Sequence, residues 1–364
     1  MDISAVRSVL VSAGYQPASL TAIQEGSNHD VFDVLLEDGR SVICKFAKVR
    51  HTELGIAAAN TDTLFGGRLS LDREAHLLSM AKEQGGLPVP KVFGTHDSPL
   101  GKFIMVEKCP GISFTASQKA HGYRLDFFLS SLRALGADFG KLHRNIQFSS
   151  FGNIMSDCIE PGTANFADRF LSVTEMRIDR AVRKGTFTPA ETEQVRSFFH
   201  SRFEELRPRL TVEAAPPVMV FTDMHGENFF VDENGVPSGY FDLESSQAAP
   251  AALEFYGFRF FLFNFYDQET FAKAEEAFFS GYRAAGGPFA PKDDMDDALI
   301  RLLAGCRLLE LAQSYWGYVD GIRDNWAQEM KDLLFQYMER DVVEYSALGA
   351  IWRERDGQPA HPVL

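Results

Sequence analysis

The chain has 364 residues, 45% of them hydrophobic and 24% charged, a balance typical of a folded globular protein that excludes a disordered one. Its formal net charge is −14, from 36 basic and 50 acidic residues, which argues against nonspecific binding to nucleic acid or anionic membranes. No apolar run approaches the roughly 18 residues of a membrane span, and the scattered cysteines indicate free thiols, no zinc site and a cytoplasmic protein.

In chain order, the first residues are expected to form a small antiparallel sheet with one preceding helix. An amphipathic helix over residues 1–14 leads into strands at 19–25, 31–36 and 41–46. Small, turn-forming residues separate the first two strands, and Lys45 lies near the end of the third.

A long segment separates Lys45 from the next expected helix. Residues 51–70 are rich in small side chains and are interpreted as an insertion. The helix that follows, at 71–84, carries Glu74. A strand at 103–107 then runs into a Pro-Gly break, which predicts a link between two parts of the chain.

Beyond this link the sequence is mainly helical. Apolar residues recur at helical spacing in segments at 127–145, 165–184, 189–210, 268–285, 292–318 and 322–347. His143, at the end of the first segment, is interpreted as a structural residue. Several aromatic residues further on either belong to the core or line a pocket for a ring-bearing substrate: Phe258, Phe261, Tyr266, Tyr315 and Trp316.

The segment 218–244 carries the residues whose types and spacing suggest chemistry. Its apolar runs and the turn at Glu233-Asn234-Gly235 indicate strand, loop, strand, turn and strand. Asp223 and Asn228 lie in the loop, and Asp242 follows the last strand. An Asp followed five residues later by an Asn is the spacing of a kinase catalytic loop, in which the Asp accepts the proton of the attacking hydroxyl and the Asn binds magnesium. Asp242 would supply the main carboxylate ligand.

Two motifs resemble the aminoglycoside phosphotransferase and choline kinase superfamily, whose members usually read H-G-D-x-H-x-x-N in the loop and I-D-[WF]-[ED] at the metal strand. Here the loop reads Phe221-Thr222-Asp223-Met224-His225-Gly226-Glu227-Asn228 and the strand Phe241-Asp242-Leu243-Glu244. Phe221 and Thr222 depart from the usual His-Gly pair, while His225 matches the second His. The resemblance implies an α+β, bilobal protein-kinase-like fold. A small antiparallel β-sheet would form the N-terminal lobe (1–109), and a mainly helical C-terminal lobe (110–364) would follow.

The resemblance implies a role for each residue of the catalytic segment. Asp223 is the expected catalytic base, and Asn228 and Asp242 are the expected Mg²⁺ ligands. Glu254 aligns with an Asp that family members use to brace the catalytic loop, and we expect it to do the same here.

The nucleotide is expected to bind the first lobe. Lys45 would contact the phosphates, and Glu74 would hold Lys45 in place by an ion pair. The other candidates form the loop that covers the phosphates and the hinge beside the base: Gly26, Ser27, Asn28, Met105, Glu107 and Cys109.

We therefore expect a small-molecule kinase that uses Mg²⁺ and ATP or GTP to phosphorylate a hydroxyl of an antibiotic-like natural product. One alternative is a metabolic alcohol kinase of the choline, homoserine or methylthioribose type. Another is a catalytically silent nucleotide-binding module, suggested by Phe221-Thr222. A third is a metallohydrolase built on Asp223, His225, Glu227 and Asp242. The expected partner is a small-molecule hydroxyl acceptor, with no nucleic acid or membrane, and the chain is either a monomer or a homodimer.

Overall fold

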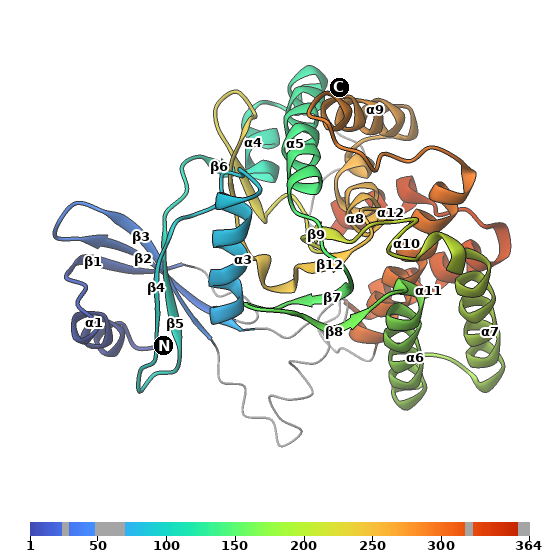
Figure 1. Cartoon of the computed structure of the whole chain (residues 1–364), viewed down its shortest axis with the longest axis horizontal. Helices are drawn as coiled ribbons and strands as arrows, with labels where there is room; N and C mark the ends of the chain where they lie inside the picture. Colours follow the sequence, from blue (N-terminus) through green and yellow to red (C-terminus); the bar gives the residue numbers. More distant parts are fainter. Residues whose placement is uncertain (24–28, 48–69, 317–322, 356–364) are drawn as a thin grey trace.

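The computed structural model describes residues 1–23, 29–47, 70–316 and 323–355. The expected phosphate-covering loop at Gly26, Ser27 and Asn28, and all of the expected insertion except Ser70, lie outside the described residues. Figure 1 shows a β-sheet at the left, between helices α1 (Ile3–Ser12) and α3 (Leu71–Glu83), and a larger, mainly helical part at the right. The mixed α+β architecture predicted from the sequence is confirmed.

The sheet of the first part is antiparallel, in the order β1-β2-β3-β5-β4. Its strands are β1 (Pro17–Ile23), β2 (His29–Leu36), β3 (Ser41–Ala47), β4 (Val92–His96) and β5 (Phe103–Glu107). Successive residues of a strand point to opposite faces. Strand β5 therefore sends Phe103 and Met105 to a small core that includes α1, and Ile104 and Val106 to the main core that includes α3.

Helix α3 ties the sheet to the rest of the molecule. Ser70 caps the helix by accepting a hydrogen bond from the Arg73 N–H. The buried Arg73 side chain donates through Nε to the carbonyl oxygen of Ile154 at 2.9 Å, and through its other nitrogens to the carbonyl oxygens of Glu244 and Ser246. The helix that carries Glu74 is thereby fixed against the segment that follows Asp242.

Two small sheets carry the segment 218–244. One contains β6 (Ile112–Ser113), β10 (Phe229–Val231) and β11 (Pro237–Tyr240), and the other contains β7 (Phe151–Ile154), β8 (Ile159–Thr163), β9 (Val218–Val220) and β12 (Gln247–Ala249). Strands β10 and β11 form the expected hairpin, with Phe229 opposite Tyr240. Because β9 and β10 belong to different sheets, the loop that joins them spans the space between the sheets.

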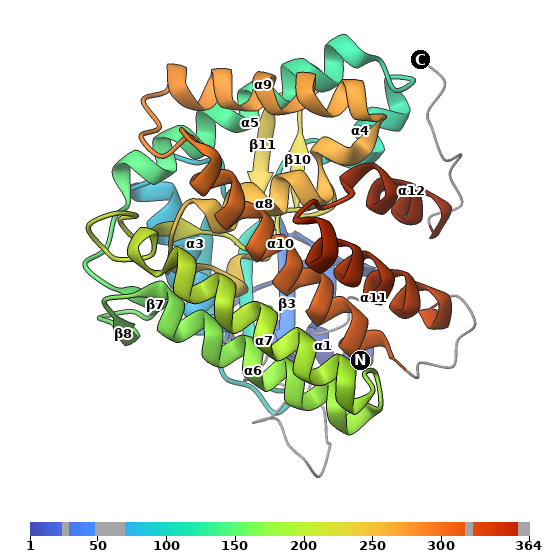
Figure 2. The same cartoon turned by 90° about the vertical axis from the view of Figure 1, so that its right-hand side faces the viewer.

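Helices make up most of the second part. They are α4 (Phe114–Ala120), α5 (Leu125–Asn145), α6 (Phe166–Lys184), α7 (Pro189–Leu206), α8 (Ala252–Phe261), α9 (Gln268–Ala284), α10 (Asp294–Tyr315), α11 (Arg323–Arg340) and α12 (Tyr345–Arg355), with a short 3₁₀ turn η3 (Phe263–Phe265). Figure 2 shows α5 alongside α9, and α6, α7, α10 and α11 packed against one another. None of the described helices combines the length and apolarity needed to cross a membrane.

The prediction of one continuous helix over 322–347 is wrong, because the structure divides this segment into α11 and α12. Asp341 follows α11 with a left-handed φ of 53°, and α12 begins at Tyr345. The Asp341 carboxylate lies 2.8 Å from Arg202 Nη2 and 3.0 Å from Arg301 Nη2. These ion pairs to α7 and α10 hold the break, and α12 then packs against α8 and η3.

Candidate active site

The loop after β9 begins at Phe221, which a buried carboxylate holds in place. The Phe221 backbone N–H donates to Glu254 Oε2 at 2.7 Å. Burial raises the pKa of Glu254 to about 8, although this hydrogen bond acts in the opposite direction. The Phe221 ring packs edge-on against the rings of Phe139 and Tyr240. Phe221 is therefore a core residue, and Glu254 contacts the loop that we expected it to brace.

Thr222 makes the backbone turn for which the family usually has glycine. Its φ is 64°, in the left-handed region that favours glycine. The buried hydroxyl donates to the Ser245 carbonyl oxygen at 3.2 Å and lies 3.0 Å from Ser245 Oγ. The substitutions at Phe221 and Thr222 are thus accommodated by packing and hydrogen bonding, and the loop turns in spite of them.

A hydrogen bond between Asn228 and Asp223 closes this loop. Asn228 Nδ2 donates to the backbone oxygen of Asp223 at 2.7 Å, and the Asn228 N–H donates to the His225 carbonyl oxygen at 2.9 Å. This leaves the side-chain oxygen of Asn228 as the atom that would ligate a cation. The Asp223 side chain is 28% exposed, with Oδ1 3.8 Å from Arg307 Nη2. Its carboxylate is therefore partly accessible from outside the protein.

Lys45 lies between two carboxylates from different parts of the chain. Its Nζ is 3.0 Å from both carboxylate oxygens of Glu74 and 2.8 Å from Asp242 Oδ1. Burial lowers the pKa of Lys45, but the neighbouring carboxylates outweigh it and the net shift is upward. Burial likewise raises the pKa of Asp242, but the Lys45 ammonium outweighs it and the net shift is downward. Both groups are therefore charged at neutral pH.

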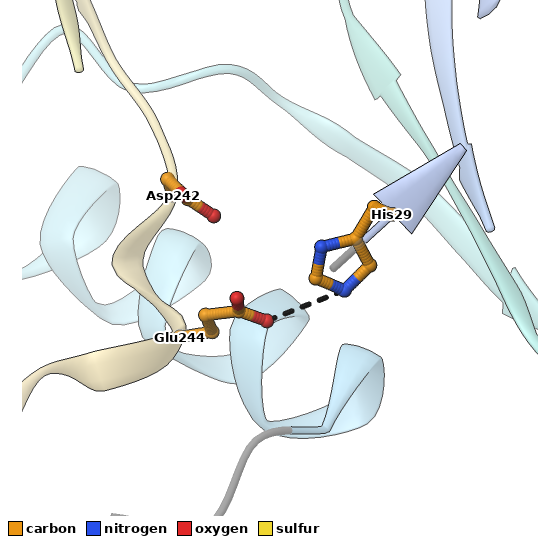
Figure 3. Close-up of side chains that lie close together, drawn as sticks. All are labelled: His29, Asp242 and Glu244. Atoms are coloured by element: carbon orange, nitrogen blue, oxygen red, sulfur yellow. Dashed lines mark ion pairs between the residues drawn. The ribbon is translucent and has the colours of Figure 1, made fainter. Parts of the chain in front are cut away.

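Figure 3 shows the side chains of His29, Asp242 and Glu244 gathered at one point. Their donor atoms lie within 4.8 Å of one another, and His29 Nε2 is 3.4 Å from Glu244 Oε2. Within the described part of the chain, these are the three His, Cys, Asp or Glu side chains whose donor atoms lie close enough together to share a metal ion. The oxygens of Asp242, Glu244 and Asn228 are hard donors of the kind that Mg²⁺ prefers, so the residues present fit that ion.

The lysine and carboxylate cluster lines a pocket of about 350 Å³ between the sheet and the β10–β11 hairpin. Its polar members include Lys45, Glu74, Asn228, Asp242 and Glu244, and its apolar walls include Val31, Ile43, Ile104, Val106, Phe230 and Phe241. Glu107 and Cys109 also line it.

The expected place of Met105 has to be corrected. Its side chain is buried in the small core that includes α1 and does not line the pocket. Residues alternate between the two faces of a strand, so Ile104 and Val106 face the pocket in its place.

A second pocket, of about 360 Å³, lies on the other side of the loop and shares no described lining residue with the first. Asp223, His225 and Glu227 line it from the loop, and residues of α8, α10, α11 and α12 form its other walls. Of the aromatic residues predicted to line a pocket or to belong to the core, Phe261 and Tyr315 line this pocket. Phe258 and Tyr266 are buried in the core, and Trp316 is not among the described lining residues. Two aromatic residues that were not predicted, Trp326 and Trp352, also line the pocket.

This division separates the residues of the metallohydrolase alternative. Asp223, His225 and Glu227 line the second pocket, and Asp242 lines the first. Within the described residues, these four side chains do not form a group that could hold a metal ion.

Three further residues shape the site that were not predicted to do so. Glu244 could have been found, because it stands in the motif at the metal strand. Arg73 and Arg307 reach the site from helices without a recognisable motif, and their roles depend on tertiary contacts.

His143 is buried, in keeping with its interpretation as a structural residue. Its Nδ1 lies 3.0 Å from the Tyr282 hydroxyl, and burial lowers its pKa to about 3.

Comparisons with known proteins point to phosphotransferases. A family model described as the phosphotransferase enzyme family matches residues 19–291. A search of curated proteins finds no match.

Solved structures resemble the whole chain. A candidate fructosamine-3-kinase from Thermobifida fusca is 14% identical, with a TM-score of 0.59, and the match covers 91% of this chain and 98% of that one. A GDP complex of an aminoglycoside 2′-phosphotransferase variant is 12% identical, with a TM-score of 0.57 and coverage of 93% and 98%. A macrolide 2′-phosphotransferase from Brachybacterium faecium is 13% identical, with a TM-score of 0.52 and coverage of 90% and 97%. At these identities the likeness is one of fold, and it confirms the predicted protein-kinase-like architecture.

Proposed function

Because the chain belongs to the phosphotransferase enzyme family and is a small-molecule kinase, we propose that it transfers the γ-phosphoryl group of ATP or GTP to a hydroxyl of an antibiotic-like natural product. The observation that carries this proposal is the position of Asp223 beside an open pocket, with a separate pocket holding Lys45, Glu74 and Asp242 across the loop. Phosphoryl transfer places the acceptor hydroxyl in line with the γ-phosphate, so two pockets on either side of one loop suit it.

Asp223 would orient the acceptor hydroxyl and take its proton as the new P–O bond forms. The transition state of phosphoryl transfer is loose, so positioning and charge stabilisation contribute more than strong base catalysis. The partial exposure of the Asp223 carboxylate and the closed loop beneath it support this role.

Lys45 would offset the charge of the nucleotide phosphates, while Glu74 holds its ammonium in place. Asn228, Asp242 and Glu244 would hold Mg²⁺, which when bound offsets the negative charge of the transferred group. The apolar walls of the same pocket suit a purine base, and Glu107 and Cys109 would lie at its edge.

A nucleotide-consumption screen tests the proposal, with ATP and GTP supplied separately against aminoglycosides, macrolides and metabolic alcohols. We expect one acceptor to gain the mass of one phosphate. Asp223→Asn should slow this reaction by about 100-fold or more without preventing nucleotide binding. Asp242→Ala should be at least as damaging, because it removes a proposed metal ligand and one of the two carboxylate partners of Lys45.

The other outcomes separate the alternatives. Phosphorylation of choline, homoserine or methylthioribose in place of a natural product would favour the metabolic kinase. Tight nucleotide binding without turnover of any acceptor would favour the silent module. Absence of nucleotide binding would contradict the proposal.

A further inference from the structure

The pocket on the Asp223 side has an aromatic wall, formed by Phe261, Tyr315, Trp326 and Trp352. Neighbouring rings of this wall are in contact: the ring centroids are 4.3 Å apart for Tyr315 and Trp326, 5.1 Å for Trp326 and Trp352, and 6.2 Å for Phe261 and Trp352. Helices α8, α10, α11 and α12 each contribute one ring. Such a surface buries a large apolar area when the ring of a ligand stacks on it.

Two buried arginines line the same pocket, and hydrogen bonds fix both guanidinium groups. Arg307 Nη1 donates to Glu310 Oε2 at 2.6 Å, and the guanidinium carbon lies 5.5 Å from the centre of the Phe261 ring. Arg353 Nη1 donates to the Asn264 carbonyl oxygen at 3.0 Å. Arg307 is therefore paired with Glu310, and Arg353 places a second guanidinium group beside the aromatic wall.

This distribution of charge disfavours a cationic acceptor. Among the described lining residues, the carboxylates are Asp223 and Glu227, and Asp223 is required for the hydroxyl. A polycation would bring several ammonium groups towards Arg353 and the Arg307–Glu310 pair, and among the described lining carboxylates Glu227 alone is left to pair with them once Asp223 receives the hydroxyl. Aromatic rings can bind an ammonium group by cation–π contact, and Arg307 already occupies that position over one of the four rings, that of Phe261.

We infer that the acceptor is an alcohol on a largely apolar aromatic ring system that carries no net positive charge. The inference rests on the proposed function, in which the acceptor hydroxyl meets Asp223. The ring would stack on the aromatic wall, and a neutral polar or anionic group would face Arg307. A new P–O bond forms at the hydroxyl, its proton passes to Asp223, and the nucleoside diphosphate leaves.

Tryptophan fluorescence gives a binding readout that does not depend on catalysis. Of the three tryptophans in the chain, Trp326 and Trp352 belong to the wall and Trp316 directly follows Tyr315. The probes share their rings and their hydroxyl: 4′-(hydroxymethyl)biphenyl-4-carboxylate, its neutral methyl analogue and its cationic aminomethyl analogue. We expect the first two to bind about tenfold more tightly than the third, a difference of ~1.4 kcal/mol. Kanamycin and choline should give no saturable response.

Variants connect this order of affinities to the residues. Trp352→Leu should weaken all three biphenyl probes by about tenfold, because it removes a stacking ring. Arg307→Gln should remove the preference for the carboxylate over the aminomethyl probe, and Arg307→Lys should keep it. Arg283→Gln on α9 is the control, because the exposed Arg283 pairs with Glu276 and does not line the pocket. Binding of Mg²⁺–nucleotide in the other pocket verifies that each variant is folded.

Tightest binding of the aminomethyl probe, kanamycin or choline would overturn the inference, as would the absence of a saturable response to every biphenyl probe. Asp223-dependent phosphorylation of kanamycin would also overturn it, while supporting the proposed function. If the expected order of affinities holds and no probe is phosphorylated, the inferred class of ligand is supported and the failure belongs to the proposed function.

Discussion

Thr222 combines a β-branched side chain with a left-handed backbone, which costs an L-residue about 1–2 kcal/mol. Its contacts with Ser245 offset that cost. Thr222→Val keeps the strained backbone and loses the hydrogen bonding, so we expect it to lower the free energy of unfolding by about 2 kcal/mol. Thr222→Gly relieves the strain and should stay within about 1 kcal/mol of wild type. Urea denaturation measures both variants, and a valine variant as stable as wild type would contradict this explanation.

Glu254 should make the stability of the protein depend on pH. Burial raises its pKa to about 8 in the folded state, from an ordinary value near 4.5. Between these values the folded protein holds a proton that the unfolded chain releases, so the stability contributed by Glu254 is complete below about pH 4.5 and is lost as the pH rises to about 8. Glu254→Gln keeps an oxygen acceptor for the Phe221 N–H but does not titrate.

The glutamine variant should therefore gain stability relative to wild type as the pH rises through this window, by on the order of 4 kcal/mol, and the gain should level off above it. Urea denaturation across the range from about pH 5 to pH 9 checks this. The difference between the two proteins isolates Glu254 from other titrating groups such as Glu244. A difference that does not change with pH would show that Glu254 is ionised in the folded state.

At the scale of elements, helices α5 and α9 approach so closely that glycine is required where they touch. A Cβ atom on Gly281 would lie 1.9 Å from the Arg133 carbonyl oxygen, and one on Gly136 would lie 2.0 Å from the Phe278 carbonyl oxygen. We expect Gly281→Ala or Gly136→Ala to lower the free energy of unfolding by about 3 kcal/mol or more, because backbone atoms must move apart. Thermal denaturation measures the loss.

Gly257→Ala in α8 is the matched control for these variants. A Cβ atom there meets nothing within 4 Å, and alanine favours a helix by about 1 kcal/mol over glycine. This variant should be as stable as wild type or more so. Equal destabilisation by all three substitutions would show that close helix contact is not the cause.

Local patterns in the sequence were enough to predict most helices and strands and the loop that Asp223 and Asn228 close. They could not predict features that depend on distant residues. The break at Asp341 requires arginines from α7 and α10. The position of Met105 depends on which face of β5 carries α1. Arg307 shapes the second pocket because α10 passes beside the loop, and no motif marks it.

At the scale of the whole molecule, the pocket that contains Lys45 and Asp242 is lined by both parts of the structure. Ile43 and Ile104 come from the sheet, and Phe230 and Phe241 from the second part. A bound nucleotide would therefore hold the two parts together. A ligand that binds only the native state at 100 times its Kd adds about 2.7 kcal/mol of stability.

We expect Mg²⁺–ATP or Mg²⁺–GTP to raise the Tm by several degrees in scanning calorimetry. EDTA or Asp242→Asn should remove most of this shift, because the nucleotide phosphates would lose their bridging cation. An equal shift with EDTA present would contradict the assignment of Asp242 as a metal ligand.

The separation of the two pockets bears on how such a protein can change over generations. Described residues of the first sheet, of α3 and of the segment 228–244 contribute most of the lining of the first pocket, whereas the second draws mainly on the loop residues 223–227 and on helices α8, α10, α11 and α12. In the proposed function, substitutions at Tyr315, Trp326 or Trp352 would therefore alter which compound is accepted without disturbing the residues proposed to bind the phosphates. During evolution, single substitutions in the C-terminal helices could thus change the acceptor, while selection conserves the chemistry of phosphoryl transfer.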